Sequence, residues 1–358
     1  VTTGMPICLL VYNQDARSKD YSHLKDIFRP GHADYSWYKK FKIFDHRGGG
    51  RASGRETISR VAAGAVVNEI LGNINIALYP IKIGNIYANN FDNFPNELNW
   101  PDSTNYEQVL EYLNKIKAEG NSAGGIVEVV ISNLPPGLGD PVFEKLDANL
   151  AKAIVSIGAV KGIEFGSGFE FSGLTGKEAN DELNSNGFIS NNCGGILGGV
   201  SSGEEIRFRF VVKPTPSINL EQQTISHENK EIKFQTGGRH DILIIPRIIP
   251  VAEAMIKLVL ADAISHQKLI SKQDLQLSDL REAFDKIDED ILIALSRRQQ
   301  LSAIIGKLKK QQNIPIEDKD REIKMLDNLI EKANKMGMSS KFIENIWSEI
   351  LKESKKNQ

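Results

Sequence analysis

The sequence has little cysteine. Its two cysteines, Cys8 and Cys193, lie far apart, and neither belongs to a CxxC pair. This spacing argues against a disulfide framework and against a zinc site. Because free thiols persist in reducing compartments, we expect a cytoplasmic protein.

Long apolar runs and an excess of charge of one sign are also lacking. No uninterrupted apolar stretch approaches the roughly 18 residues that a membrane-spanning helix needs, and the first residues lack the basic segment of a secretory signal. With 44 Lys and Arg against 46 Asp and Glu, the formal net charge is −2. No overall positive field therefore draws the protein to nucleic acid or to an anionic membrane, and we expect neither as a partner.

What is present is an ordinary globular composition in two parts. The 358 residues are 41% hydrophobic and 25% charged, which suits two domains. Residues 1–268 are glycine-rich and alternate β-like runs, such as GGIVEVVISNLP and EIRFRFVVKP, with helical stretches such as ETISRVAAGAVVNEIL. Over residues 274–358 glycine nearly vanishes and apolar residues recur at helical spacing. We therefore expect an α+β domain followed by an all-α domain, joined by a short polar connection.

Three helices are predicted in the second domain, and each carries polar residues on its apolar face. Arg298 interrupts the stripe of the first helix, Glu322 shares the stripe of the second with Asp318 one turn before it, and Ser354 and Gln358 continue the stripe of the third. An unpaired charge in a core costs several kcal/mol, so these groups pair with one another or bind a ligand. A buried ion pair explains any single position, whereas the whole set favours a ligand site.

The first of these helices is too long for its domain. About 32 residues at 1.5 Å each span nearly 50 Å, more than a compact domain of roughly 85 residues covers alone. We therefore expect two chains to intertwine as a dimer.

Three segments of this domain resemble one family along their whole length: LREAFDKIDEDILIALSRRQQLSAIIGKLK, IEDKDREIKMLDNLI and FIENIWSEILKES. They are similar to the all-helical chorismate mutases, which form intertwined dimers of three-helix chains. The resemblance implies that the active site comprises Arg281, Arg298, Lys309, Asp318, Arg321, Glu322, Ser354 and Gln358. It also implies that Arg281 reaches over from the partner subunit and that Arg321 orients a neighbour rather than contacting substrate.

The implied reaction suits these residue types. Chorismate becomes prephenate by a unimolecular rearrangement that needs no nucleophile, metal or cofactor, so catalysis consists of holding a compact conformer and stabilising developing charge. The two arginines would clamp the substrate carboxylates with their guanidinium forks, assisted by Ser354. Lys309 and Gln358 would donate to the ether oxygen, while Glu322 and the Asp318 region would accept from the ring hydroxyl.

The first domain combines glycine-rich turns with basic residues in five segments: RPGHADYSWYKKF, DHRGGGRASGRET, SIGAVKGIEFGSGF, KPTPSI and GGRHD. Glycine lets backbone N–H groups approach an anion, and arginines add charge-assisted hydrogen bonds. The pattern indicates a phosphate or flavin site. A Walker A loop is absent, as is GxGxxG after a strand, which disfavours ATPase and Rossmann readings.

In order, from VTTGMPI to VAEAMIKLVLADA, these segments resemble chorismate synthase, a β-α-β sandwich. That family eliminates phosphate from 5-enolpyruvylshikimate 3-phosphate with reduced FMN, without net redox change. The resemblance implies that Arg29, His32 and Arg55 face the substrate, with His32 as an acid, and that Asp241 helps the flavin N5 take the substrate proton. The implied flavin-binding residues are Arg47, Ser53, Gly54, Gly158, Ala159, Lys213, Ser217 and Arg239.

The chain departs from the synthase pattern at its beginning. It starts inside the family pattern, without the segment whose GESHG-like motif supplies the second acidic histidine. From this we expect weak FMN binding and little phosphate release by the chain as written. Two hypotheses follow: a bifunctional enzyme of two consecutive steps, or an active mutase attached to an inactive synthase remnant that binds ligand or supports oligomerisation. A homo-oligomer is expected in either case, through the mutase dimer, with a tetramer through the synthase part left open.

Overall fold

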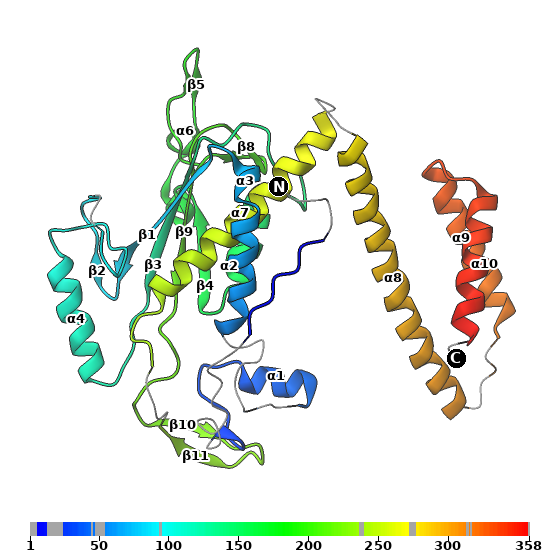
Figure 1. Ribbon diagram of the computed structural model, residues 1–358, viewed down its shortest axis with the longest axis horizontal. Coiled ribbons are helices and arrows are strands. Elements are labelled where there is room, and N and C mark those ends of the chain that lie inside the picture. The colour runs from blue at the N-terminus through cyan, green and yellow to red at the C-terminus, as the bar shows by residue number, and fades with distance from the viewer. Residues whose placement is uncertain are drawn as a thin grey trace. The chain divides into compact units, whose positions relative to one another are not determined.

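The computed structural model describes residues 6–12, 24–43, 46, 54–92, 95–235, 240–271, 277–312, 315 and 317–356. The chain divides into two compact units, Val1–Ser271 and Lys272–Gln358 (Figure 1).

Both helices and strands build the first unit. Its helices are α1 (Asp34–Phe41), α2 (Thr57–Val66), α3 (Asn68–Leu71), α4 (Tyr106–Ala118), α5 (Leu146–Val155), α6 (Gly176–Ala179) and α7 (Ile245–Ser271). Its strands are β1 (Asn75–Ile83), β2 (Ile86–Tyr87), β3 (Gly125–Ser132), β4 (Val160–Phe165), β5 (Leu183–Asn184), β6 (Gly187–Phe188), β7 (Ile196–Leu197), β8 (Val200–Ser201), β9 (Ile206–Val212), β10 (Gln222–Ile225) and β11 (Glu231–Phe234).

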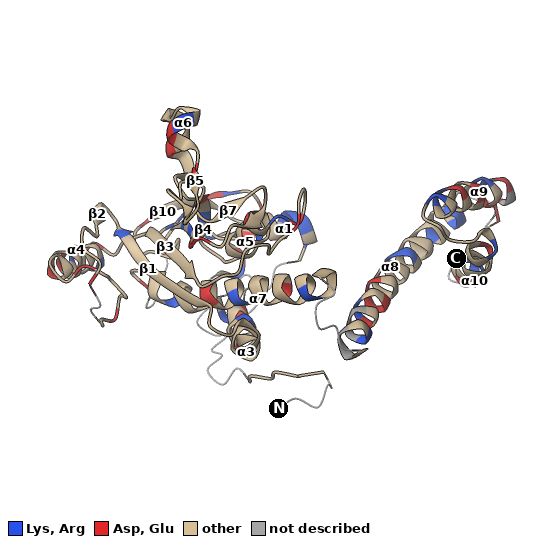
Figure 2. Cartoon of the chain, turned by 90° about the horizontal axis from the view of Figure 1, so that it is seen from above, with Lys and Arg blue, Asp and Glu red and all other residues tan. Residues whose placement is uncertain are grey.

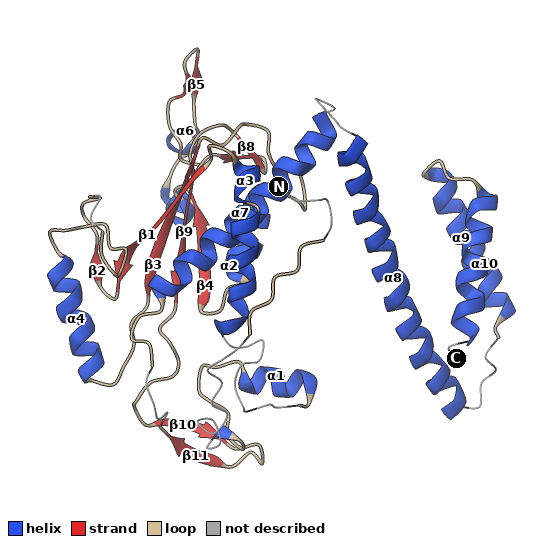
Figure 3. Cartoon of the chain, viewed as in Figure 1, coloured by secondary structure: helices blue, strands red, loops and turns tan. Residues whose placement is uncertain are grey.

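Five strands form one antiparallel sheet in the order β2-β1-β3-β9-β4 (Figure 3). Buried residues alternate strictly with less buried ones along both β3 and β9, as expected for strands with one face in a core. Val129 pairs with Phe208 across these strands, and Phe208 pairs with Phe165 of β4, so large apolar side chains line the inner face. This face of the sheet is the wall on which the helices pack.

Helices cover the inner face and complete the core. The helix α5 contacts β4, α7 contacts β1, and α2 and α3 pack on α7. Seen from above, α3 and α7 lie on the same side of β1 and β3 (Figure 2). The contact between α2 and α7 is close because Gly64 has no side chain: a Cβ there would lie 2.5 Å from the Cβ of Ala254. Trp100, Phe210 and Leu260 are fully buried in the resulting core.

The second unit consists of α8 (Leu277–Gln311), α9 (Lys319–Lys335) and α10 (Ser340–Lys356). A tight turn joins α9 to α10. Gly337, with φ of +78°, ends α9 in a Schellman motif, in which Met338 N donates to Ala333 O at 2.9 Å and Gly337 N to Asn334 O at 3.1 Å. Basic and acidic residues are interspersed along all three helices (Figure 2).

Most of the predicted apolar stripe of α8 is exposed in the single chain. The exposed members are Leu277, Leu280, Phe284, Ile287, Ile291, Leu301 and Leu308. Among the described residues of this unit, the buried hydrophobic ones are Ala333 and Ile343. Length contributes to this exposure: 35 residues of α8 extend about 52 Å, whereas 17 residues of α9 or α10 extend about 26 Å, so neither shorter helix can cover more than about half of α8.

The predicted class is thereby confirmed at its coarser level. The glycine-rich region is α+β with an antiparallel sheet, and the region after it is helical. The run GGIVEVVISNLP contains β3, the run EIRFRFVVKP contains β9, and the predicted helix ETISRVAAGAVVNEIL is divided into α2 and α3 at Val67. The dimer stays a prediction.

Candidate active sites

A polar cluster occupies the loop that leads into α1. The buried carboxylate of Asp34, the first residue of the helix, accepts hydrogen bonds from Arg29 Nε at 2.7 Å and Arg29 Nη2 at 3.0 Å. Its Oδ1 lies 2.6 Å from Nδ1 of His32. Burial opposes ionisation of Asp34, but the hydrogen bonds from His32 and Arg29 outweigh it and hold the pKa of this carboxyl below its usual range. Two residues predicted to face the substrate, Arg29 and His32, thus both contact the buried carboxylate of Asp34.

Lys213, at the end of β9, connects this loop to the predicted flavin residues. Its Nζ donates to Gly31 O at 2.7 Å, and its backbone N donates to Ala159 O at 2.9 Å. Gly31 has φ of +67°, and a Cβ there would lie 3.1 Å from Cβ of Pro216, the neighbour of Ser217. Residues far apart in the sequence therefore meet beside His32.

Asp241 lies close to the same strand end. Thr215 Oγ1 donates to Asp241 O at 2.7 Å, and the Asp241 carboxylate pairs with Arg247 Nη1 at 2.8 Å. Arg247 lies in the first turn of α7 and is exposed. The ion pair with Arg247 and the bond from Thr215 therefore hold Asp241 between the residues that follow β9 and the start of α7.

Gly54 and Arg55 begin the turn before α2 and are exposed. Farther along α2, Arg60 Nη1 donates to Ser156 Oγ at 2.7 Å, which holds α2 beside the end of α5. Gly158 lies two residues after Ser156, in the turn that follows α5, and precedes Ala159, whose φ is +73°. This contact brings the two glycine-rich segments near each other. Three predicted flavin residues, Arg47, Ser53 and Arg239, lie outside the described residues.

In the second unit, Arg298 of α8 donates through Nη1 to Oγ of Ser354, a buried hydroxyl on α10. Ser354 Oγ donates in turn to Ile350 O at 2.8 Å. Because its proton is used in that bond, the hydroxyl oxygen accepts from Arg298. These two predicted site residues are therefore brought together.

Asp318 and Glu322 occupy the beginning of α9. Asp318 is its N-cap and accepts from Arg321 N at 3.1 Å. Glu322 lies 3.1 Å from Nζ of Lys355, which also pairs with Glu317 at 2.8 Å. Hydrogen bonds from Lys355 to these two glutamates raise the pKa of its ammonium. The sequence reading missed Lys355, although it directly follows Ser354.

The remaining predicted mutase residues are less closely associated. Lys309 is half-buried, 11 residues beyond Arg298 and so nearly on the same face of α8. Arg281 is exposed and lies 17 residues before Arg298, about 25 Å away along the helix axis. Within one copy, Arg281 and Arg298 cannot hold the same small molecule. Gln358 lies outside the described residues.

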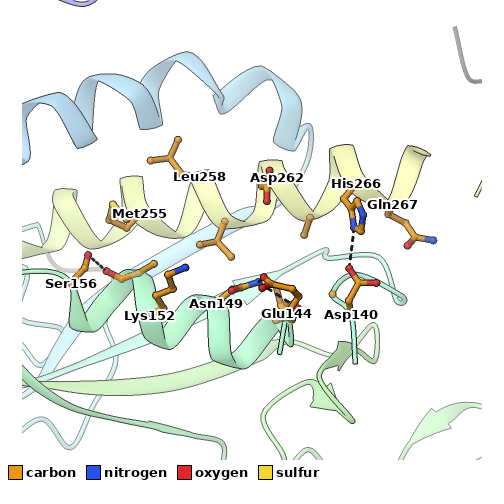
Figure 4. Close-up of a pocket in the computed structure, with 15 residues that line it drawn as sticks. Asp140, Glu144, Asn149, Lys152, Ser156, Met255, Leu258, Asp262, His266 and Gln267 are labelled. Atoms are coloured by element: carbon orange, nitrogen blue, oxygen red, sulfur yellow. Dashed lines mark hydrogen bonds and ion pairs between the residues drawn. The ribbon is translucent and has the colours of Figure 1, made fainter. Parts of the chain in front are cut away.

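A separate cavity of about 560 Å³ lies between α5 and α7 (Figure 4). Met255, Leu258 and Val259 form its apolar side, and His266 Nδ1 pairs with Asp140 at 3.0 Å at its rim. The residues that line it include none of those predicted for either site. The candidate sites are therefore identified by the hydrogen bonds and ion pairs among the predicted residues, and not by this cavity.

Neither a membrane helix nor a metal cluster occurs in the described part of the chain. No helix there is long and apolar enough to cross a membrane. No group of three or more His, Cys, Asp or Glu residues there is arranged to hold a metal ion.

Comparisons with known proteins agree with both resemblances. A family model described as chorismate synthase matches residues 1–265, and one described as chorismate mutase type II matches residues 280–358. A chorismate synthase of Desulfosudis oleivorans is 50% identical over 275 residues, which are 75% of this chain and 78% of the relative. One of Syntrophus aciditrophicus is 47% identical over 278 residues, 75% of this chain and 78% of the relative.

A solved structure described as chorismate synthase gives the same result for the fold. It superposes with a TM-score of 0.54 at 30% sequence identity. The match covers 72% of this chain and 76% of that one.

Proposed function

We propose that this chain, which belongs to the chorismate synthase family over residues 1–265 and carries a type II chorismate mutase domain over residues 280–358, catalyses two consecutive steps. The first domain, over residues 1–268, eliminates phosphate from 5-enolpyruvylshikimate 3-phosphate to give chorismate. The second, over residues 274–358, rearranges chorismate to prephenate. The product of one domain is then the substrate of the other.

The main support for the first step is the hydrogen bond from Lys213 to Gly31. It brings a lysine, an arginine and a histidine to one place, and such a cluster tolerates a phosphorylated dicarboxylate beside an anionic cofactor. The donor set fits reduced FMN, which the family uses: Lys213 and Ser217 would hold it with Gly54, Gly158, Ala159, Arg47, Ser53 and Arg239. When bound, reduced FMN supplies electron density that assists departure of the phosphate.

The residues of the chain then have distinct tasks. Arg29 and Arg55 bind anionic groups of the substrate. His32 donates a proton from its ring, since an imidazole is suited to proton transfer near neutral pH. Asp241, held in place by its ion pair with Arg247, helps remove the substrate proton.

For the second step, the contact of Arg298 with Ser354 carries the proposal. A guanidinium held by a buried hydroxyl is positioned to bind one substrate carboxylate. Lys309 and Gln358 donate to the ether oxygen as the C–O bond breaks. Glu322 accepts from the ring hydroxyl, with Asp318 holding the start of α9 and Lys355 holding the Glu322 carboxylate.

We further propose that two copies of the second domain intertwine. The exposed stripe of α8 gives the apolar surface, and Arg281 is too far from Arg298 to act in its own chain. In the dimer, Arg281 completes the site of the partner.

Two assays on purified full-length chain test the proposal. One supplies 5-enolpyruvylshikimate 3-phosphate and reduced FMN without oxygen and follows phosphate release; the other supplies chorismate and follows prephenate. The bifunctional proposal predicts both products, whereas the expectation of little phosphate release made from the sequence predicts prephenate almost alone. Prephenate without phosphate would support a mutase whose synthase domain serves binding or oligomerisation, and neither product would refute both activities.

A further inference from the structure

Asp34 is a buried carboxylate whose two oxygens are both occupied by functional side chains. The residue is 6% exposed. Oδ2 accepts from Arg29 Nε at 2.7 Å, and Oδ1 accepts from Arg29 Nη2 at 3.0 Å while lying 2.6 Å from His32 Nδ1. The arginine fork is bidentate, which fixes the plane of the guanidinium as well as its position.

These distances decide which ring nitrogen of His32 carries the proton. An ionised carboxylate only accepts hydrogen bonds, so a separation of 2.6 Å from Oδ1 is favourable only if Nδ1 is a donor. Arg29 Nη2 is also 3.0 Å from Nδ1 and has two N–H groups, but a bond from it to Nδ1 would leave no proton between Nδ1 and Oδ1, which are only 2.6 Å apart. If Nδ1 carried no proton, its lone pair would face the carboxylate oxygen, and the shortest contact of the cluster would be repulsive.

We propose that Asp34 is a positioning residue, whose carboxylate fixes neutral His32 as the Nδ1–H tautomer and holds Arg29 beside it. The inference rests on the proposed function, because His32 is the proposed acid and Arg29 the proposed anion-binding residue of the synthase step. It assigns to Asp34 a task that no sequence pattern gave it.

The consequence for the reaction lies in the second ring nitrogen. With Nδ1 committed to Asp34, proton exchange with a ligand takes place at Nε2 of His32. Lys213 anchors the same loop through Gly31, so Asp34 adjusts the orientation of His32 within a backbone that is already held.

The tautomer can be measured directly, without substrate or FMN. Histidine labelled with ¹⁵N in the full-length chain gives long-range ¹H–¹⁵N spectra in which the two tautomers have different patterns. The spectra are recorded at alkaline pH, where imidazoles are neutral, and His32→Gln assigns the signal among the six histidines. We expect the Nδ1–H pattern for His32. An Nε2–H pattern in the unmodified chain would overturn the proposal, whether or not the enzyme releases phosphate.

Asp34→Asn provides the functional test, because the amide keeps the shape but can donate to Nδ1 and reverse the tautomer. In serine proteases the corresponding change lowers kcat by about 10⁴. Here we expect kcat for phosphate release to fall about 10²- to 10⁴-fold, with a change of the His32 pattern to Nε2–H. Asp26→Asn, an exposed change in the same loop, should alter neither.

The outcomes separate the inference from the proposed function. An unchanged His32 pattern in a folded Asp34→Asn chain, judged by circular dichroism, would contradict the positioning role. A correct pattern in the unmodified chain without any phosphate release would retain the contact but refute the synthase activity. If Asp34→Asn does not fold, the pattern of the unmodified chain still decides.

Discussion

The two units bury their apolar residues in different ways. In the first, large side chains of β3, β9 and β4 meet those of α5 and α7, and the core closes within one chain. In the second, α8 leaves most of its apolar stripe in solvent. A sheet covered by helices can thus stabilise a domain on its own, whereas a helix twice as long as its partners needs a surface from another chain.

The largest effect expected from this difference is the loss of a core side chain in the first unit. Phe208 is 1% exposed and packs on Phe165, with ring centroids 5.1 Å apart. Phe208→Ala should lower the free energy of unfolding of this unit by about 3–5 kcal/mol, independently of protein concentration. Urea unfolding followed by tryptophan fluorescence measures it in a Trp347→Phe background, so that Trp37 and Trp100 report the first unit.

Phe169→Ala is the matched control, since this phenylalanine is 82% exposed and should change the free energy by less than about 0.5 kcal/mol. A loss below about 1 kcal/mol for Phe208→Ala, or a loss that depends on concentration, would contradict a core closed within one chain.

The next largest effect concerns the activity of the second unit, which should be independent of the activity of the first. Arg298→Ala removes the guanidinium held by Ser354 and should lower kcat/KM for prephenate formation by at least about 10², while phosphate release stays unchanged. Arg297→Ala, at the neighbouring exposed position, is the control. Steady-state kinetics with chorismate decide: equal activity of the two variants would refute the assigned role.

The exposed stripe of α8 predicts an effect on assembly. The isolated unit Lys272–Gln358 should have the mass of two chains in light scattering, and Phe284→Asp should dissociate it at micromolar concentration. Burial of a phenylalanine contributes about 1.5–3 kcal/mol per chain, and an aspartate at its place adds a desolvation cost. Ile293→Asp, nine residues along α8 and so on its opposite face, should remain dimeric. A monomer with full mutase activity would disprove the shared site.

The smallest expected effect is a loss of stability of the first unit at low pH. Buried Asp102 accepts from Asn89 N at 2.8 Å and from Thr104 Oγ1 at 2.6 Å. Burial opposes its ionisation, but these hydrogen bonds dominate and lower the pKa of the carboxyl. Because the pKa is lower in the folded state, the stabilisation is present above the unfolded value of about 4 and is lost as the pH falls toward the folded value.

Asp102→Asn should therefore destabilise the first unit by about 1–2 kcal/mol at pH 7, and the difference should shrink below about pH 4. Urea unfolding at a series of pH values measures it in the Trp347→Phe background. A difference that does not change with pH would show that the charge of Asp102 makes no contribution.

Much of this architecture could be predicted from local spacing. Alternation of apolar residues located β3 and β9, and a period of three to four located α8, α9 and α10. Glycine beside basic residues identified the loop of Arg29 and His32. Each of these signals lies within a dozen neighbouring residues, where the geometry of the chain is nearly fixed by the element that it forms.

The missed residues depend on contacts between distant segments. Asp34 looked like an ordinary acidic residue in the first turn of a helix, which is a common arrangement. Lys355 looked like the solvated face of α10, although it lies beside Glu317 and Glu322. The exposure of α8 has the same origin, because periodicity shows that a face is apolar without showing which surface covers it.

The bond from Lys213 to Gly31 has a consequence for the order of folding. It joins residues 182 positions apart, so the site of the first unit forms only after a long loop has closed. Contacts of such high sequence separation form slowly, whereas the turn between α9 and α10 closes over a few residues. During synthesis, the loop of His32 emerges early but remains incomplete until β9 has left the ribosome. The loop of His32 is thus made long before β9 but reaches its final geometry only after β9 is in place.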